Sequence, residues 1–154
     1  VHHRVKNNLQ IVSSLLYLQQ DEAESETVID SLRASSARVA AMALIHEALY
    51  GSRDVARVDM FAYTDELTRH LLSSYCVDPG EKVPLEIRGD RFTLELDRAT
   101  PCGLIINELV TNAVKHAFPD GRKGHIEIAL MEHPECFDIE IGDDGIGNVG
   151  PAGH

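Results

Sequence analysis

Apolar residues near the amino terminus recur at helical spacing. Residues 1 to about 20 carry one apolar residue every three or four positions, which places these residues on one stripe of a helix. The stripe consists of Val5, Leu9, Val12 and Leu16. An acidic stretch over residues 21–26 interrupts the pattern, and we expect a turn there. The stripe predicts a first helix that packs against a partner helix.

A second stripe follows the turn and alternates spacings of four and three for three heptads. Its members are Val28, Leu32, Ser35, Val39, Met42, His46 and Leu49. This is the 3.5-residue period of left-handed helix packing, and it predicts a helical hairpin over residues 1–52. A lone hairpin leaves much apolar surface in water, so we expect two hairpins to pair as a four-helix bundle in a homodimer. On this stripe, His46 is interpreted as a packed histidine rather than a catalyst.

The second half of the chain alternates between helical and strand patterns. Gly51 and the polar residues after it mark a boundary near residues 51–58, and a second unit is predicted over residues 58–154. The predicted elements are helices over Met60–Tyr75 and Thr100–Ala117, an edge strand over Val83–Ile87, and strands over Ile126–Met131 and Phe137–Ile141. The fold class is therefore α+β, with a helical hairpin followed by an α/β unit.

The amino-acid composition limits the partners and the cellular compartment that we expect for this chain. The chain of 154 residues has 14 basic and 25 acidic side chains and a formal charge of −11, which disfavours nucleic acid as a partner. Three cysteines lie far apart without a CxxC pair, so they are interpreted as reduced thiols of a cytoplasmic protein. No apolar run is long enough to span a membrane, and we expect membrane attachment only through segments outside this chain, which begins in mid-pattern like a fragment.

The first candidate for chemistry is the segment His2–Gln10. On a helix, His3 and Asn7 lie near one line, roughly 150° from the first apolar stripe, whereas His2 lies within roughly 50° of that stripe. His3 is thus expected to face solvent as a nucleophile, with the Asn7 amide one turn away to orient it. Taken alone, a solvated surface histidine is the commoner interpretation of such a position.

The second candidate lies on the predicted helix over Thr100–Ala117. Glu108, Asn112 and Lys115 stand four and three residues apart, so they share one helical face. An amide oxygen can ligate Mg²⁺ and an ammonium group can neutralise phosphoryl oxygens, although an exposed salt-bridged face is commoner. The opposite side is expected to be the buried stripe and holds Ile106, Leu109, Val110, Ala113 and Ala117.

The third candidate is the segment Asp143–Gly147, directly after a predicted strand. Gly145 and Gly147 let the backbone approach a ligand closely, and the Asp143 carboxylate can accept a hydrogen bond from the exocyclic amine of adenine. A pair of glycines is more often simply a turn.

The order of the three segments carries a resemblance over nearly the whole chain. His2–Gln10 resembles the phosphoacceptor box of the HisKA_2 histidine kinases, and Arg38–Tyr50 the second helix of their dimerisation and phosphotransfer domain. Asn107–Phe118 resembles the N box, and Asp143–Gly147 the first glycine box, of the GHKL ATPase fold shared with gyrase-type and heat-shock chaperone ATPases.

The resemblance implies a role for each matching residue. It makes His3 the phosphorylated histidine with Asn7 beside it, Asn112 the Mg²⁺ ligand, Lys115 and His116 phosphate contacts, and Asp143 with Gly145 and Gly147 the adenine site. Glu108 matches the water-activating glutamate of GHKL ATPases, and its role in a kinase is left open. The family pattern continues beyond the first glycine box into a lid and a second glycine motif, so the ATP-binding domain is expected to be incomplete in this chain.

The resemblance implies a sensor histidine kinase core that uses ATP and Mg²⁺. Such a core phosphorylates its own histidine and passes the phosphoryl group to an aspartate of a response regulator. Two alternatives remain open: a histidine phosphotransferase with a degenerate ATP-binding domain, and a GHKL ATPase that works as a clamp, which Glu108 would suit. A structural coiled-coil scaffold would leave the second half of the chain unexplained.

Overall fold

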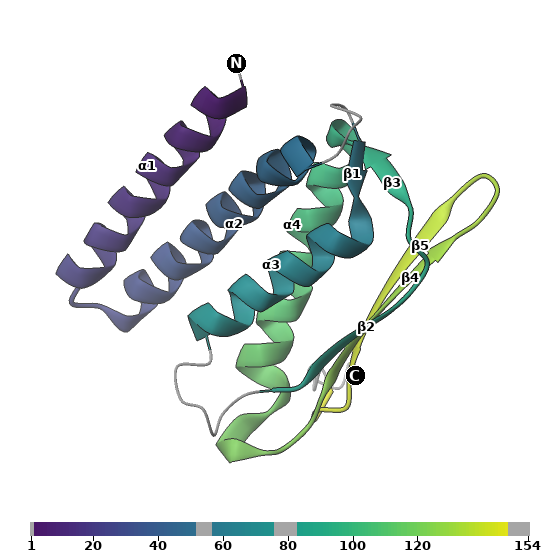
Figure 1. Cartoon of the computed structure of the whole chain (residues 1–154). Helices are drawn as coiled ribbons and strands as arrows, with labels where there is room; N and C mark the ends of the chain where they lie inside the picture. Colours follow the sequence, from purple (N-terminus) through teal and green to yellow (C-terminus); the bar gives the residue numbers. More distant parts are fainter. Residues whose placement is uncertain (1, 52–56, 76–82, 148–154) are drawn as a thin grey trace, which may run out of the picture.

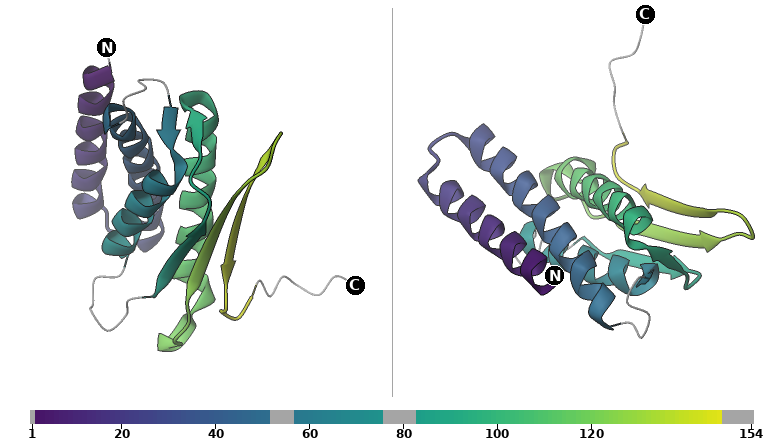
Figure 2. Two further views of the ribbon diagram at one scale, coloured as in Figure 1. Left: turned by 45° about the vertical axis from the view of Figure 1, so that its right-hand side comes forward. Right: turned by 90° about the horizontal axis from the view of Figure 1, so that it is seen from above.

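The chain folds into successive layers, with a helical hairpin, two further helices and a β-sheet (Figures 1 and 2). The computed structural model describes residues 2–51, 57–75 and 83–147. Figure 2 shows the helices gathered on one face of the sheet. The predicted fold class, a helical hairpin followed by a mixed α/β unit, is confirmed.

The hairpin consists of α1 (His2–Glu22) and α2 (Glu26–Gly51), joined by three residues in the predicted acidic turn. Polar contacts between described side chains join the helices. The Lys6 Nζ lies 2.6 Å from Glu47 Oε1, and the Ser13 and Ser36 hydroxyl oxygens are 3.4 Å apart. The partner helix that the first apolar stripe predicts is therefore α2. One residue of that stripe, Val12, is not covered by it and is 42% exposed.

Helix α2 has an apolar face that its heptad pattern does not reveal. The predicted stripe is mostly half-buried, and its first residue Val28 is exposed. The fully covered side chains belong largely to another face, which turns toward the second half of the chain: Ala37, Ala41, Ile45 and Leu49. Helix α2 therefore contributes to the main hydrophobic core of the molecule.

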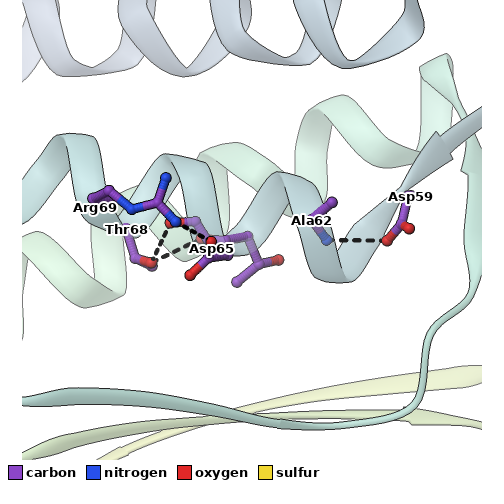
Figure 3. Close-up of polar contacts among 6 residues, drawn as sticks. Asp59, Ala62, Asp65, Thr68 and Arg69 are labelled. Atoms are coloured by element: carbon purple, nitrogen blue, oxygen red, sulfur yellow. Dashed lines mark hydrogen bonds and ion pairs between the residues drawn. The ribbon is translucent and has the colours of Figure 1, made fainter. Parts of the chain in front are cut away.

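Helix α3 (Met60–Tyr75) has the predicted bounds and follows the short strand β1 (Arg57–Asp59). Its first turn is capped by Asp59, whose Oδ1 accepts a hydrogen bond from the Ala62 N–H at 3.0 Å (Figure 3). The exposed side carries an ion pair between Asp65 and Arg69, one helical turn apart. The opposite side is buried and supplies Met60, Tyr63, Thr64, Leu67, Thr68 and Leu71.

Among the described residues, the main sheet has three strands in the order β2-β4-β5. Strand β2 (Leu85–Gly89) pairs in parallel with β4 (Ile126–Glu132), which pairs in antiparallel fashion with β5 (Phe137–Asp143). Strand β2 lies at an edge, as predicted, but begins two residues after the expected Val83. A second pair joins β1 to β3 (Thr93–Glu95), and these three-residue strands are too short to show an alternating pattern.

The crossover from β2 to β4 contains α4 (Leu96–Asn112), then a π-helical turn, η2 (Ala113–Ala117), and a 3₁₀ turn, η3 (Pro119–Gly121). The helix predicted over Thr100–Ala117 therefore begins four residues earlier, at Leu96, and its last five residues are π-helical instead of α-helical. One core cluster runs from α2 through α3 and α4 to the sheet. It holds Ile45, Tyr63, Leu67, Ile106, Val110, Ile128 and Leu130, among others.

Part of the proposed boundary between the two units lies outside the described residues, so the division at residues 52 and 58 stays a prediction. Cys102 is half-buried and Cys136 exposed, both as free thiols, and Cys76 lies outside the described residues. Within the described ranges, none of the helices has the length and apolar character needed to cross a membrane.

Candidate functional site

Helix α4 positions the site because its inner face is locked against α2 and α3. Gly103 faces the Tyr63 hydroxyl, which would lie 2.1 Å from a Cβ added at that glycine. The same hydroxyl donates a hydrogen bond to the Ala41 carbonyl at 3.1 Å, and burial raises the pKa of Tyr63. A glycine is therefore needed where the three helices meet.

Most of the predicted buried stripe of α4 is confirmed, with one correction. Ile106, Val110, Ala113 and Ala117 are buried, but Leu109 is 46% exposed. The inner face of α4 is completed instead by the polar Asn107 and Thr111. Leu109 lies beside the surface that carries Asn112, where it forms an apolar wall of the site.

The end of this helix adopts the π form over Ala113–Ala117. Such turns are rare and often mark functional sites, because they widen the helix and reorient the side chains that follow. Ala113 and Ala117 are buried with Ile126 in a small cluster against the sheet. The side chains of Asn112 and His116 are left exposed.

The segment after β5 packs against the end of this turn. The Ile146 N–H donates to the Ala117 carbonyl at 3.0 Å, and a Cβ at Gly145 would lie 2.3 Å from that oxygen. The Gly145 N–H also donates to Asp143 Oδ1 at 3.0 Å, which fixes the orientation of this carboxylate. Gly147 has a φ of +70°, in the left-handed region that favours glycine. Both glycines of the motif thus meet a steric need of the loop.

A second carboxylate fastens this loop to the start of β4. Asp144 Oδ1 accepts a hydrogen bond from the His125 backbone N–H at 2.7 Å, and its Oδ2 lies 2.9 Å from His125 Nδ1. The bond from the backbone N–H is the main reason that the pKa of Asp144 is lowered. Gly124 leaves room for this contact, since a Cβ there would lie 2.5 Å from Asp144 Oδ1. These contacts, called here the Asp144–His125 clamp, fix the position of Asp144, which directly follows Asp143.

These elements enclose a cleft of about 350 Å³ between the end of α4 and the end of β5. Four of the predicted site residues line it, together with apolar walls. The lining residues are Leu109, Asn112, Ala113, His116, Ala117, Ile141, Asp143 and Gly147. The amide of Asn112 and the carboxylate of Asp143 are therefore brought to one apolar-walled space, although 31 residues separate them in the sequence.

Three other residues predicted at the nucleotide site do not line this cleft: Gly145, Glu108 and Lys115. Glu108 Oε1 lies 2.6 Å from Arg38 Nε of α2, and the hydrogen bond from Arg38 is the main reason that the pKa of Glu108 is lowered. The Lys115 ammonium lies 5.3 Å from the centre of the Tyr75 ring at the end of α3. The expected shared face of Glu108, Asn112 and Lys115 is thus divided, with only Asn112 at the cleft.

The other candidate segment lies on α1. His3 belongs to the helix, but its side chain lies outside the described ones, as does that of His2, so the expected exposure of His3 stays a prediction. Asn7, one turn further on, is exposed. His46 is half-buried on α2, in agreement with its interpretation as a packed histidine.

The chain matches two known families in sequence. Residues 1–75 match the HisKA_2 family, described as histidine kinase, and residues 85–154 match HATPase_c_2, described as a histidine kinase-like ATPase domain. A helical hairpin with a histidine near its start, joined to this ATPase fold, defines a histidine kinase core. The chain belongs to the HisKA_2 histidine kinases and carries their ATPase domain, which implies ATP binding.

Several characterised kinases are similar to the chain. The sensor histidine kinases PdtaS of Mycobacterium tuberculosis and Mycolicibacterium smegmatis are 37% and 36% identical to it, over 96% of this chain and 29% of each relative. The histidine kinase domain of the Erythrobacter litoralis EL346 blue-light activated histidine kinase has a similar structure, with a TM-score of 0.63 at 25% identity, over 94% of this chain and 66% of that one. The chain thus spans less than a third of the length of the PdtaS proteins.

Proposed function

We propose that this chain is the catalytic core of a sensor histidine kinase that phosphorylates itself on His3 and passes the phosphoryl group to an aspartate of a response regulator. The cleft that joins Asn112 to Asp143 carries the proposal, because it lies in the ATPase-like half of a chain whose first 75 residues match histidine kinases. The shared family with the PdtaS sensor kinases supports it.

The nucleotide fits the cleft chemically. Asp143 would accept a hydrogen bond from the exocyclic amine of adenine, and the apolar walls at Leu109 and Ile141 would cover the base. The Asn112 amide oxygen would ligate Mg²⁺, which prefers oxygen ligands and phosphates.

The reaction moves one phosphoryl group. A lone pair on an imidazole nitrogen of His3 forms the new N–P bond while the bond from the γ-phosphorus to the bridging oxygen breaks and ADP leaves. The other imidazole nitrogen releases its proton to water, and the Asn7 amide, one turn along α1, would orient the ring. The resemblance makes Lys115 and His116 the contacts to the transferred phosphoryl group: His116 lines the cleft, and Lys115 would have to turn from the Tyr75 ring to reach it. Positioning with charge stabilisation would supply most of the catalysis.

The exposed face of α1 supports homodimerisation. Ile11, Leu15 and Leu18 recur at helical spacing and are 59%, 57% and 59% exposed, and Val28 of α2 is 48% exposed. Such an apolar face on a helix that contacts the rest of the chain chiefly through α2 is suited to pairing with a second copy. The core is proposed to work in the cytoplasm, where ATP is present.

The test is ATP-dependent formation of phosphohistidine. The intact kinase is incubated with MgATP labelled in the γ-phosphate, and acid-labile, alkali-stable phosphate on the protein is measured. We expect labelled protein that loses its label to a receiver domain. Label that arrives only from another phosphorylated protein would favour a phosphotransferase, and steady phosphate release without phosphoprotein would favour a clamp ATPase.

A further inference from the structure

The Asp144–His125 clamp joins two segments that lie 19 positions apart in the sequence and meet beside the cleft. His125 directly precedes β4 and Asp144 directly follows β5, so the clamp lies just beyond the last residue pair of these strands. Figure 1 shows the start of β4, the end of β5 and the carboxyl end of α4 at the same end of the molecule. The clamp therefore lies where the glycine loop leaves the sheet.

The two contacts of the clamp depend on the sequence in different ways. Asp144 Oδ1 accepts a hydrogen bond from the His125 backbone N–H at 2.7 Å, and any residue except proline can donate that bond. Asp144 Oδ2 lies 2.9 Å from Nδ1 of the ring, and this contact needs a side chain that carries a donor at that place. The His125 ring thus has a specific partner, which strand pairing alone does not require.

The residues around the clamp hold Asp144 from other directions. A Cβ at Gly124 would lie 2.1 Å from the Phe118 ring atom Cε1 and 2.5 Å from Asp144 Oδ1, so the backbone passes closely between these side chains. Arg122 Nη2 donates a hydrogen bond to the Asp144 carbonyl at 3.4 Å. Asp144 is therefore held through its side chain and through its backbone.

Asp144 can act on the cleft through its neighbour in the chain. Asp143 lines the cleft and Asp144 does not. On the other side of Asp144, the Gly145 N–H donates to Asp143 Oδ1 at 3.0 Å. The Ile146 N–H donates to the Ala117 carbonyl at 3.0 Å, which fastens the loop to the end of the π turn. A shift of Asp144 would therefore displace the carboxylate that is proposed to meet adenine, without any contact between the clamp and the nucleotide.

The strength of the ring contact depends on the charge of the imidazole. The hydrogen bond from the His125 backbone N–H lowers the pKa of Asp144, which favours the carboxylate form. Imidazole side chains gain or lose their charge between about pH 5 and 8. A charged donor forms a shorter and stronger hydrogen bond to a carboxylate than a neutral donor does. Both side chains are about half exposed, so this gain is modest.

Other charged side chains lie near the pair. Among the described residues, they belong to the ends of β4 and β5 and to the turn before β4: Asp143, Glu127, Arg122 and Lys123. Side chains of these types ordinarily keep one charge state between about pH 6 and 8. His116 lines the cleft and is a second imidazole beside the nucleotide site. A measurement of pH dependence therefore has to separate the two histidines.

We propose that His125 is a positioning residue of the nucleotide site, whose ring holds the glycine loop through Asp144 so that Asp143 meets the exocyclic amine of adenine. Protonation of the ring tightens the clamp, so the affinity for nucleotide contains a contribution that falls as the pH rises through neutrality. Because an exposed ion pair contributes little, this contribution is about threefold in affinity. The inference rests on the proposed nucleotide-binding role of the cleft.

The test measures the affinity of the intact kinase for MgADP, which carries the adenine but no transferable γ-phosphate, by calorimetry at about pH 6 and about pH 8. His125→Asn keeps the backbone bond and removes the titrating ring. The dissociation constant at the higher pH, divided by that at the lower pH, should be about threefold larger in the wild type than in His125→Asn. Titration of the nucleotide and of His116 affects both proteins alike and cancels in this comparison.

The matched control is His133→Asn. His133 forms a pair of the same kind at the other end of the β4–β5 hairpin, with its Nε2 2.9 Å from Asp138 Oδ2, and it does not line the cleft. This variant should keep the wild-type ratio. Asp144→Asn should give the same reduced ratio as His125→Asn although the ring is retained, and the double variant should reduce the ratio no further.

Amide hydrogen exchange follows the loop without nucleotide. The Gly145 and Ile146 N–H groups are hydrogen-bonded in the folded loop. After correction for the intrinsic exchange rates, their protection at about pH 6 should fall about threefold in His125→Asn and stay unchanged in His133→Asn.

Equal affinity ratios in the wild type, His125→Asn and Asp144→Asn would overturn the proposal. So would a reduced ratio in His133→Asn, because the pH dependence would then follow the charge of the hairpin and not the clamp. Unchanged loop protection in His125→Asn and Asp144→Asn would overturn the clamp itself. If the wild-type kinase binds no MgADP but loop protection falls in His125→Asn and not in His133→Asn, the clamp stands and the proposed nucleotide site fails.

Discussion

The two helices of the hairpin look alike in sequence but have different surroundings. From Arg4 to Glu22, none of the described side chains of α1 is fully buried. Helix α2 contributes Ala37, Ala41 and Ile45 to the core that it shares with α3, α4 and the sheet. Helix α2 is therefore packed into the core of the ATPase-like half, whereas α1 is held chiefly by α2 and has the exposed apolar face that is proposed to pair with a second copy.

The largest expected effect comes from the buried face of α2. Ile45 is fully buried, so Ile45→Ala should lower the free energy of unfolding by about 2–5 kcal/mol. The matched control Ile11→Ala removes a side chain that is 59% exposed and should change it by about 0.5 kcal/mol or less in dilute protein. Urea unfolding measures both, and equal losses would contradict the contrast between the helices.

Substitutions on the exposed face of α1 should weaken dimerisation and have little effect on the free energy of unfolding. Leu15→Glu places a charge in the proposed dimer interface and should weaken dimerisation by about tenfold or more, since a buried leucine contributes about 1.5–3 kcal/mol. Ile105→Glu on α4 is the control, because Ile105 and Leu15 are both 57% exposed. Sedimentation analysis follows the dimer. A wild-type chain that is monomeric at tens of micromolar would refute the proposed interface.

Substitutions at the cleft should reduce nucleotide binding without changing dimerisation. Asp143→Asn in the intact kinase removes the carboxylate that would accept the adenine amine, so calorimetry should show loss of ATP binding with an unchanged dimer. Asp144→Asn weakens the clamp on His125 and should reduce affinity less, because the residue positions the loop and does not line the cleft. A larger loss in Asp144→Asn than in Asp143→Asn would reverse the assigned roles.

The smallest expected effect is on the interaction free energy between Arg38 of α2 and Glu108 of α4. Because the pKa of Glu108 is lowered in the folded protein, its ion pair with Arg38 contributes stability above the unfolded pKa of this carboxyl. That contribution is lost as the pH falls through the lower, folded pKa. A double-mutant cycle of Arg38→Ala and Glu108→Gln should give about 0.2–1 kcal/mol near neutral pH and nothing in acid. A coupling independent of pH would rule out an electrostatic origin.

The sequence was informative where an element has a clear apolar period or a fixed motif. The hairpin turn and both ends of α3 were predicted correctly, because long periodic segments with capping residues specify helices. Asn112 and Asp143, from two separate motifs, line one cleft, and their roles in nucleotide binding stay predictions.

Other features depend on tertiary contacts that periodicity does not encode. Leu109 was expected in the core, but the chain covers the inner side of α4 with Asn107 and Thr111 and leaves Leu109 at the cleft. The π turn changes the angular spacing beyond Asn112, so an α-helical projection misplaces Lys115 relative to it. Nothing local in sequence signals the pairing of Arg38 with Glu108, because 70 residues separate them.

The most direct test of the central claim maps the phosphorylated residue. The intact kinase is labelled with MgATP, digested at alkaline pH and analysed by mass spectrometry. The phosphoryl group should be found on His3 and be absent from His3→Gln, which should still dimerise and bind ATP. His2→Gln should keep most of the label and Asn7→Ala should acquire it more slowly, because that amide orients the ring without accepting phosphate. Phosphate on His2, or undiminished label in His3→Gln, would contradict the account.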